Sequence, residues 1–475
     1  MPDLWKARAR AIRAREAVTG KRELAARRAF NRLARSMLRG GAPRGTLITA
    51  GNNSYGKCLL PGTADIAVPT NTSLSCLPDR NHVLQTAVGF VFTLLLDDHG
   101  IVYAVGNNSR GALGRGDNND DDPDNLVPRP VPGLERIVQI AAGKDHCAAV
   151  TDSGQLLMWG DNGSGQCGTG VAGGNVLAAT QCDAGALAGN VRVVFVACGM
   201  FHTVALTSDG GVIVFGDNYS GQLGTGNNDR QLIPKRLAAL AGIVGCAAGS
   251  MFTHLVSAEG RVFAMGDNDF GQLGLGHTNH VITPHEIDAA HFDGQKVAAV
   301  ACGFNHTMAI TREGKLFSCG SGYNGSTGLG HTTHTNTPQP VVAPLANMRV
   351  MRIVAGMNRS FALTNDGRVF GFGNIIGVPA AGAQDIPLLQ EGALAGTTVS
   401  ALSTGCYASH VVFIAGAPPT APGFDALRQT SWQRRRLLLL ALLQRRRDQP
   451  AAAASVLPCA AALPPELWPD LLKYV

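Results

Sequence analysis

The sequence predicts an all-β fold, a seven-bladed β-propeller of about four strands per blade, from three observations. A segment recurs every 50–56 residues, each recurrence contains two apolar runs around a tight turn, and half a unit is left over at each end of the repeat region. Glycine supplies 59 of the 475 residues, and charged residues make up only 16% of the chain. That composition favours tight turns over salt-bridged helices.

The first observation is a short glycine-bounded segment that begins seven times along the chain. Successive starts are separated by 55, 54, 56, 50, 54 and 53 residues. The copies are GNNSYG at Gly51, GNNSRG at Gly106, GDNGSG at Gly160, GDNYSG at Gly216, GDNDFG at Gly266, GSGYNG at Gly320 and a shortened GNIIG at Gly373. A period of this length indicates one supersecondary unit per repeat, stacked on its neighbours.

The second observation is a hairpin signal inside each unit. In Ala197–Gly216 (ACGMFHTVALTSDGGVIVFG) the apolar run Val204–Leu206 meets a Thr-Ser-Asp-Gly turn, and a second run, Val212–Phe215, follows. Two β-prone runs around an Asp-Gly turn are typical of a β-hairpin. A turn glycine recurs six residues before each segment glycine, so the hairpin is predicted in every complete unit.

The third observation predicts that the ring is closed by both ends of the repeat region. The chain has an unpaired second half at GTLITAG, Gly45–Gly51, and an unpaired first half at GCYASHVVFIAG, Gly405–Gly416. The spacing of eleven residues between Gly405 and Gly416 matches the spacing within complete units. Pairing the two half-blades makes a seventh blade and removes exposed strand edges. Residues 45–416 therefore form the predicted propeller, with helical tails at both ends.

The first copy continues as GNNSYGKC, residues 51–58, which nearly matches the phosphate-loop pattern G-x-x-x-x-G-K-[ST]. Cys58 stands where a Ser or Thr would hold Mg²⁺, and only this copy has Lys after its second glycine. A phosphate loop has no reason to recur seven times. We therefore interpret the segment as a structural turn and expect no cofactor.

The clearest units, CGMFHTVALTSDG with GDNYSGQLGTG and CGFNHTMAITREG with GDNDFGQLGLG, resemble the repeats of the regulator of chromosome condensation family. The resemblance covers about residues 45–416 and implies a seven-bladed propeller. The founding member of that family is a guanine-nucleotide exchange factor for a small nuclear GTPase, while many relatives are scaffolds, receptors or ubiquitin-ligase modules. The partners that the resemblance implies are a small GTPase, a client protein or a ubiquitin-ligase subunit.

Histidines at one repeated place are predicted to be structural, because a repeated position serves packing or hydrogen bonding. The residues three after the glycine that precedes each hairpin are His146, His202 and His306, with Phe92, Phe252, Arg359 and Ala408 in the other units. A second group, His277 and His280 with His331 and His334, could gather on one rim. No Cys or carboxylate completes a metal-ligand spacing there, so no metal site is assigned.

An acidic insertion gives the first group of candidate partner-binding residues. The segment GDNNDDDPDN, Gly116–Asn125, lengthens one loop by four residues, and its carboxylates are Asp117, Asp120, Asp121, Asp122 and Asp124. The loop lacks Gly and Glu at the positions where an EF-hand requires them, so calcium binding of that type is not expected. A solvated loop and a contact for a basic partner remain the two interpretations.

The N-terminal tail, residues 1–44, carries thirteen Lys and Arg residues against three acidic ones and favours a helix. Its basic face supplies candidates for binding an anionic surface: Arg28, Arg32, Arg35 and Arg39. Three interpretations stay open: a helix docked on the propeller or solvated, a patch for nucleic acid, chromatin or nuclear import, and an organelle presequence.

The C-terminal segment, residues 417–475, ends in LPPELWPDLLKYV, which is similar to the opening helix of an F-box. The apolar candidates for a partner contact are Leu467, Leu471 and Leu472. Pro469 interrupts the helix, and the rest of an F-box is missing. The alternatives are a helix docked on the propeller rim and a ubiquitin-ligase contact.

No G-x-S-x-G elbow, H-E-x-x-H motif or defined pair of catalytic carboxylates occurs, so no catalytic residue is assigned. Eleven scattered cysteines indicate reduced thiols in the nucleus or cytoplasm, and no apolar run reaches membrane-spanning length. The favoured function is a protein-interaction or regulatory adaptor, with a ubiquitin-ligase adaptor as one form. The alternatives are an exchange factor for a small GTPase and a chromatin or nucleic-acid tether.

Overall fold

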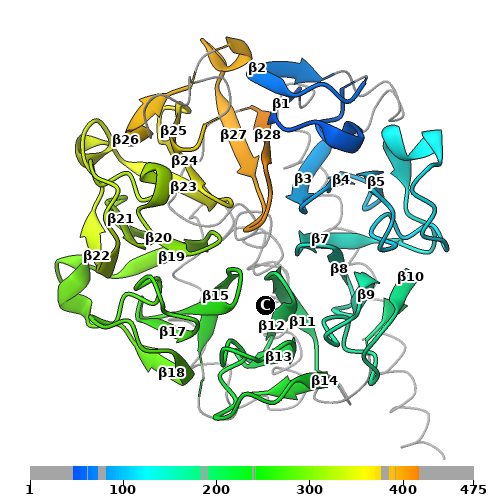
Figure 1. Cartoon of the computed structure of the whole chain (residues 1–475), viewed down its shortest axis with the longest axis horizontal. Coiled ribbons are helices and arrows are strands. Elements are labelled where there is room, and N and C mark those ends of the chain that lie inside the picture. The colour runs from blue at the N-terminus through cyan, green and yellow to red at the C-terminus, as the bar shows by residue number, and fades with distance from the viewer. Residues whose placement is uncertain are drawn as a thin grey trace, which may run out of the picture. The chain divides into compact units, whose positions relative to one another are not determined.

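The computed structural model confirms the seven-bladed β-propeller: seven four-stranded antiparallel sheets surround a central axis (Figure 1). It describes residues 46–416 apart from 61, 73–81, 183–186, 188–190, 238–239, 241, 376–383 and 391, and gives only the backbone of 384–389 and 392. The predicted helical tails, 1–44 and 417–475, lie outside the described residues. So do Arg28, Arg32, Arg35, Arg39, Leu467, Leu471 and Leu472.

The first three blades follow one another along the chain. Blade 1 contains β3 (Val83–Val88), β4 (Phe92–Asp97), β5 (Val102–Gly106) and β6 (Arg129–Pro130). Blade 2 contains β7 (Ile137–Ala142), β8 (His146–Thr151), β9 (Leu156–Asp161) and β10 (Asn175–Gln181). Blade 3 contains β11 (Val193–Cys198), β12 (His202–Thr207), β13 (Val212–Gly216) and β14 (Gln231–Arg236).

The remaining blades repeat the same order, and the last one joins the two ends of the repeat region. Blade 4 contains β15 (Ile243–Ala248), β16 (Phe252–Ser257), β17 (Val262–Gly266) and β18 (Val281–Glu286). Blade 5 contains β19 (Val297–Cys302), β20 (His306–Thr311), β21 (Leu316–Gly320) and β22 (Thr335–Pro340). Blade 6 contains β23 (Val350–Ala355), β24 (Arg359–Thr364), β25 (Val369–Gly373) and β26 (Gln384–Leu389). Blade 7 contains β27 (Val399–Ser403), β28 (His410–Ala415), β1 (Leu47–Gly51) and β2 (Ile66–Thr72).

Short 3₁₀ helices interrupt the connections between strands. They are η1 (Ser54–Gly56), η2 (Pro123–Leu126), η4 (Ala289–Phe292), η5 (Tyr323–Gly325), η6 (Leu345–Asn347) and η7 (Gly392–Leu394). Single turns of this kind are common as connectors.

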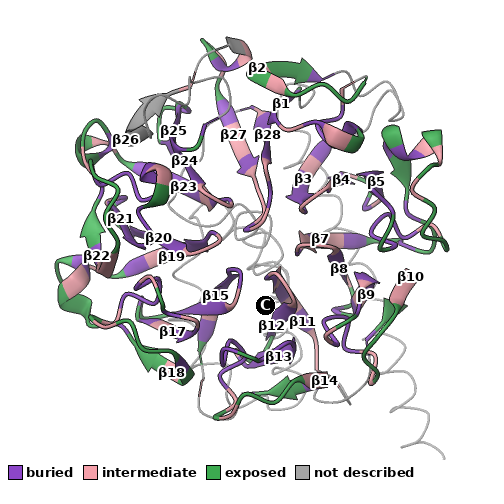
Figure 2. Cartoon of the chain, viewed as in Figure 1, coloured by how far each residue is buried: buried purple, intermediate pink, exposed green. Residues whose placement is uncertain are grey.

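The hydrophobic core lies between neighbouring blades. One apolar cluster joins Met158 of blade 2 to Phe215 of blade 3, and the next joins Val214 of blade 3 to Leu255 of blade 4. Because neighbouring blades cover both faces of the inner strands, every residue of β12 (HTVALT) is buried. The strand therefore does not alternate between apolar and polar residues along its length. The outermost strands, such as β14, β18 and β22, carry the exposed positions (Figure 2).

Local geometry explains the sequence repeat. In the predicted hairpin turn the Gly210 amide donates to the Thr207 carbonyl (2.9 Å), and Gly210 has φ +79°, which favours glycine. In the following loop the buried Asn218 side chain accepts from the Leu223 amide (2.9 Å) and donates to the Asn227 carbonyl (2.7 Å). One asparagine thereby closes the loop, and Asn53, Asn108, Asn162 and Asn268 do the same in their blades.

Blade 7 forms as expected, with β1 paired to β28 from Leu47↔Ile414 to Gly51↔His410. Ala408 was predicted to occupy the position of the repeated histidines in this blade, and that prediction is wrong. His410 occupies it, because His410 pairs with Gly51 as His202 pairs with Gly216 in blade 3. The turn before β28 is longer than its counterparts, so the eleven-residue spacing from Gly405 to Gly416 did not mark equivalent positions.

The repeated histidines bind neighbouring blades together, as predicted for a structural position. The Thr253 hydroxyl donates to the Gln222 carbonyl (2.8 Å) and therefore accepts from Nε2 of His202 (3.0 Å). His410 makes the same contact with Thr93 (2.7 Å) and links blade 7 to blade 1. Burial lowers the pKa of His202 to about 3, so the ring is neutral in the folded protein.

Candidate protein-interaction face

The turns between first and second strands and the loops between third and fourth strands lie at the same edge of every blade, because successive strands run antiparallel. We call this surface the loop face. Its turns are residues 89–91, 143–145, 199–201, 249–251, 303–305, 356–358 and 404–409, and its loops are residues 52–65, 107–128, 161–174, 217–230, 267–280, 321–334 and 374–375. The opposite surface, which we call the hairpin face, carries the turns between second and third strands and the connections between blades.

Aromatic rings meet across the axis of the loop face. The ring of Tyr407 packs edge-on against Phe90 (centroids 5.0 Å apart) and Phe304 (5.2 Å), which lie in blades 1 and 5. Nζ of Lys144 lies 5.3 Å from the ring centroids of both Tyr407 and Phe201. All five residues are half-buried, and so are Met200, Met251 and Met357 on the same turns. We call these eight residues the axial cluster.

Exposed tyrosines stand on three loops around the axial cluster. Tyr219 is 80% exposed, Tyr323 is 63% exposed and Tyr55 is 42% exposed. Tyrosine and methionine are enriched at protein interfaces, where tyrosine often anchors the contact. The gathering of three exposed tyrosines on one face therefore marks that face as a candidate contact surface.

The loop face is acidic, with twelve carboxylates against five cations among the described residues. The carboxylates are Asp65, Asp117, Asp120, Asp121, Asp122, Asp124, Asp145, Asp161, Asp217, Asp229, Asp267 and Asp269, and the cations are Lys57, Arg110, Arg115, Lys144 and Arg230. On the hairpin face the described turns and connections hold nine carboxylates and eight cations. The two faces therefore differ in potential, and the loop face attracts cations.

The predicted acidic candidates lie on the loop face, and most of them organise their own loop. Asp120 accepts from the Asn108 amide (2.8 Å), and Asp117 accepts from the Asn108 side chain (2.8 Å). Asp122 caps η2 through the Asp124 amide (2.9 Å), and Asp124 pairs with Arg129. The exposed carboxylate of Asp121 makes none of the contacts found among the described residues, so it is the one most available to a partner.

The histidines that could have gathered on one rim do not form a cluster of imidazoles. Nδ1 of His277 accepts from the Asn279 amide (3.2 Å), and Nδ1 of His334 accepts from the Gly322 amide (3.2 Å). His331 contacts the neighbouring Thr333 hydroxyl (2.8 Å). Each of these rings thus has a polar contact within its own loop, and the His334 ring also packs edge-on against Phe270 of the neighbouring loop (centroids 5.0 Å apart).

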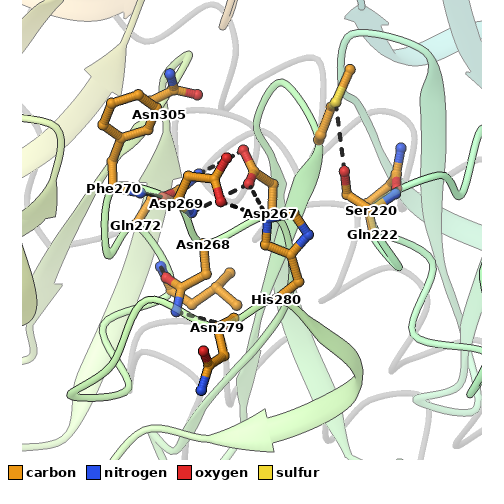
Figure 3. Close-up of polar contacts among 12 residues, drawn as sticks. Ser220, Gln222, Asp267, Asn268, Asp269, Phe270, Gln272, Asn279, His280 and Asn305 are labelled. Carbon is orange, nitrogen blue, oxygen red and sulfur yellow. Dashed lines mark hydrogen bonds and ion pairs between the residues drawn. The ribbon is translucent and has the colours of Figure 1, made fainter.

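The group that does come together in blade 4 is Asp267, Asp269 and His280. Nε2 of His280 lies 3.0 Å from Asp267 Oδ1 and 2.9 Å from Asp269 Oδ1, while Gln272 donates to Asp267 Oδ2 (2.9 Å) (Figure 3). Burial is the main cause that raises the pKa of Asp267. Two carboxylates and an imidazole can ligate a metal ion, but here the imidazole bridges the carboxylates. Sequence reasoning missed both aspartates, although each stands in the repeated segment.

Lys57, in the segment that resembles a phosphate loop, is 1% exposed and reaches inward. Its Nζ lies 3.4 Å from the Phe90 carbonyl and 3.3 Å from Ser409 Oγ. Burial lowers the pKa of Lys57 to about 8. A single 3₁₀ turn, η1, replaces the α-helix that follows a phosphate loop, so the structural interpretation of the segment stands.

The glutamine side chains that line the cavity on the propeller axis are already hydrogen-bonded within the protein. A cavity of about 170 Å³ is lined by the inner strands of blades 1, 2, 3, 6 and 7. Its two glutamines are occupied: Gln85 bonds the Ile140 amide (3.0 Å) and carbonyl (2.8 Å), and Gln139 bonds Val196 in the same way (2.9 and 2.8 Å). These residues join the inner strands of neighbouring blades and leave the loop face as the better candidate site.

Comparison with known proteins agrees with the repeat analysis. The chain is 33% identical over 263 residues to the ultraviolet-B receptor UVR8 of Arabidopsis thaliana, covering 55% of this chain and 58% of that protein. It is 31% identical over 363 residues to the human E3 ubiquitin-protein ligase HERC2, covering 73% of this chain but only 7% of that protein. The matched regions are thus parts of these relatives.

Solved structures share the fold. The structure of human WBSCR16 superposes with a TM-score of 0.66 at 24% identity, covering 79% of this chain and all of that one. Yeast RCC1 (Prp20), solved bound to Kap60, superposes with a TM-score of 0.68 at 20% identity, covering 82% of this chain and 92% of that one. In the described part of the chain no helix has the length and apolarity to span a membrane.

A family model described as the RCC1-like domain matches residues 46–378, a range that contains all seven segment glycines, from Gly51 to Gly373. The match coincides with the blades whose hairpins and asparagine-closed loops are described above. The chain therefore belongs to the family of RCC1-like domains.

Proposed function

We propose that this propeller is a regulatory protein-interaction adaptor that binds a partner protein on its loop face. The observation that carries the proposal is the combination of exposed Tyr219 and Tyr323, the axial cluster and an acidic surround on one face. Interface hot spots are typically aromatic and are surrounded by polar residues. The described residues of the hairpin face include no tyrosine, and their carboxylates and cations nearly balance.

Affinity capture with paired variants tests the proposal. Tyr219→Ala with Tyr323→Ala removes two exposed rings from the loop face and no buried contact. Glu259→Ala with Glu313→Ala changes exposed residues of the hairpin face and is the matched control. We expect the first pair to lose proteins that the wild-type chain captures and the control pair to retain them. Retention by the loop-face pair would contradict the proposal.

A ubiquitin-ligase adaptor is one form of this function. It draws support from the similarity to a region of the protein named E3 ubiquitin-protein ligase HERC2, and from the F-box-like segment at residues 463–475. The proposal places the protein in the nucleus or cytoplasm. All nine described cysteines are free thiols, which suits a reducing compartment.

Nucleotide exchange on a small GTPase is the second candidate function. Its support is the acidic insertion Gly116–Asn125, which lies in the longest described loop of the loop face (residues 107–128), together with a fold shared with yeast RCC1. Release of a fluorescent GDP analogue from a nuclear-transport GTPase tests it, with Asp121→Asn as the loop variant. We expect no acceleration. Acceleration that Asp121→Asn removes would establish exchange as the function.

A further inference from the structure

The third-to-fourth-strand loops share a closing pair of side chains at their base. One member directly follows the repeated glycine, and the other lies thirteen residues further along the chain, directly before the fourth strand in blades 3, 4 and 7. In blade 3 Asp217 Oδ1 lies 3.2 Å from Arg230 Nε, and in blade 4 Asp267 Oδ1 lies 3.0 Å from His280 Nε2. A basic side chain thus faces each of these aspartates.

In blades 7 and 1 the two roles are exchanged: the residue after the repeated glycine is the donor, and the later residue is the carboxylate. Asn52 donates to Asp65 (2.9 Å), and Asn107 donates to Asp120 (2.5 Å). In each case a carboxylate has a donor across the base of the loop. This makes the closing pair a regular element of the loop face in these four blades.

Blade 2 keeps the aspartate and lacks the base. Gly160 pairs with Val176 as Gly216 pairs with Gln231, so by strand register the residue equivalent to Arg230 is Asn175, and the residue directly before β10 is Gly174; both are neutral. Gln166 donates to Asp161 (2.7 Å) as Gln222 donates to Asp217 (2.9 Å). The carboxylate is therefore held as in blade 3, yet no ion pair among the described residues includes Asp161.

The surroundings of Asp161 add negative charge. Asp145 lies on the turn of the same blade, and its backbone carbonyl accepts from the Asp161 amide (2.9 Å). Burial raises the pKa of the Asp145 carboxyl, and the Asp161 charge raises it further to a smaller extent. Lys144 Nζ lies 4.0 Å from Asp145 and also faces the rings of the axial cluster. Arg110 of blade 1 acts on Asp145 as well. These two cations oppose Asp145, while the Asp161 carboxylate accepts only from neutral donors, the Gln166 side chain (2.7 Å) and the Gly163 amide (3.3 Å), among the described residues.

We infer that Asp161 receives an arginine side chain of the partner protein, in the place that Arg230 fills in blade 3. This inference rests on the proposed function. Arginine is the expected base because its planar group pairs with a carboxylate at two points and stacks on aromatic rings. Nucleic acid is not expected to bind the loop face, since its phosphates would meet the twelve carboxylates there.

The test uses the full chain and a fluorescein-labelled hexa-arginine peptide as the probe, measured by fluorescence anisotropy at low and physiological salt. Asp161→Asn removes the receptor charge, and Asn175→Arg supplies the missing base within the chain. Asp229→Asn, an exposed aspartate on the neighbouring loop of the same face, is the matched control for total charge. Thermal melting verifies that each variant is folded.

We expect Asp161→Asn and Asn175→Arg each to weaken peptide binding about tenfold and Asp229→Asn to weaken it less than about twofold. Equal weakening by all three, or no weakening by Asp161→Asn, would overturn the inference. If Asn175→Arg does not fold, Asp161→Asn against Asp229→Asn decides alone.

The two proposals fail separately. In one outcome a partner protein no longer binds the Tyr219→Ala, Tyr323→Ala variant but binds Asp161→Asn at full affinity. This refutes the inference that Asp161 receives an arginine and leaves the proposed adaptor function standing. The opposite outcome is that Asp161→Asn alone weakens binding of the hexa-arginine peptide, while the Tyr219→Ala, Tyr323→Ala variant still captures the partner proteins. That outcome refutes the proposal that the exposed tyrosines carry the adaptor function.

Discussion

Replacing Lys57 with methionine should stabilise the propeller at neutral pH. Lys57 is 1% exposed, and the two hydrogen bonds of its ammonium group, to the Phe90 carbonyl and Ser409 Oγ, are long at 3.4 and 3.3 Å. Methionine fills a similar volume without a charge. The change leaves the Phe90 carbonyl without this donor, which offsets part of the gain by about 1 kcal/mol.

The pKa of Lys57 sets the size and the pH range of the effect. Burial lowers that pKa from 10.5 in the unfolded chain to about 8 in the folded one. A difference of this size corresponds to about 3 kcal/mol at 1.36 kcal/mol per pH unit. Below pH 8 both states carry the proton and the cost to folding is complete. Between pH 8 and 10.5 the unfolded state binds more protons, so the wild-type protein gains stability as pH rises.

Urea unfolding of wild type and Lys57→Met at pH 7, 9 and 10.5 measures this effect. We expect the variant to be more stable by about 1–3 kcal/mol at pH 7 and the difference to shrink towards pH 10.5. Lys296→Met removes an exposed lysine of the hairpin face and is the matched control. A Lys57→Met variant less stable than wild type at pH 7, or a difference that grows with pH, would refute the account of an uncompensated buried charge.

The remaining predictions concern closure and the two tails. Deleting residues 403–416 removes β28, which pairs with β1 and β27, so urea unfolding should lose its single cooperative transition; an unchanged transition would contradict the closed ring. Residues 1–44 should bind DNA without sequence preference, with log K falling against log salt at a slope near about −5 if roughly six basic residues meet phosphates; binding insensitive to salt would point to its apolar residues. Leu471→Asp should lower the melting temperature if the C-terminal segment docks on the propeller, whereas unchanged melting with loss of a ubiquitin-ligase subunit would favour the F-box-like interpretation.

Short-range signals were sufficient to predict the blades. The Asp-Gly turn at Gly210 and the loop closed by Asn218 each form within about ten residues, so their spacing is visible in the chain. The half-units at the ends were also sufficient to predict β1 beside β28. The position of His410 was not predictable from spacing, because its equivalence with His202 is defined by pairing to Gly51, some 360 residues away.

The candidate site depended on the tertiary structure for a related reason. Phe90, Phe304 and Tyr407 stand on turns of three different blades, and only the closed ring brings their side chains together. The acidic insertion was interpreted as a solvated loop or a partner contact, but the structure alone shows that three of its five carboxylates hold their own loop and a fourth pairs with Arg129 of β6. Asp161 looked like every other aspartate of the repeat. Its distinction arises from a neutral residue across the loop, and register decides which residue that is. The sequence by itself determined the repeated unit and its closure, because those rest on local turns and strand edges; the tertiary structure decided the loop face, because side chains from distant turns meet only around the axis.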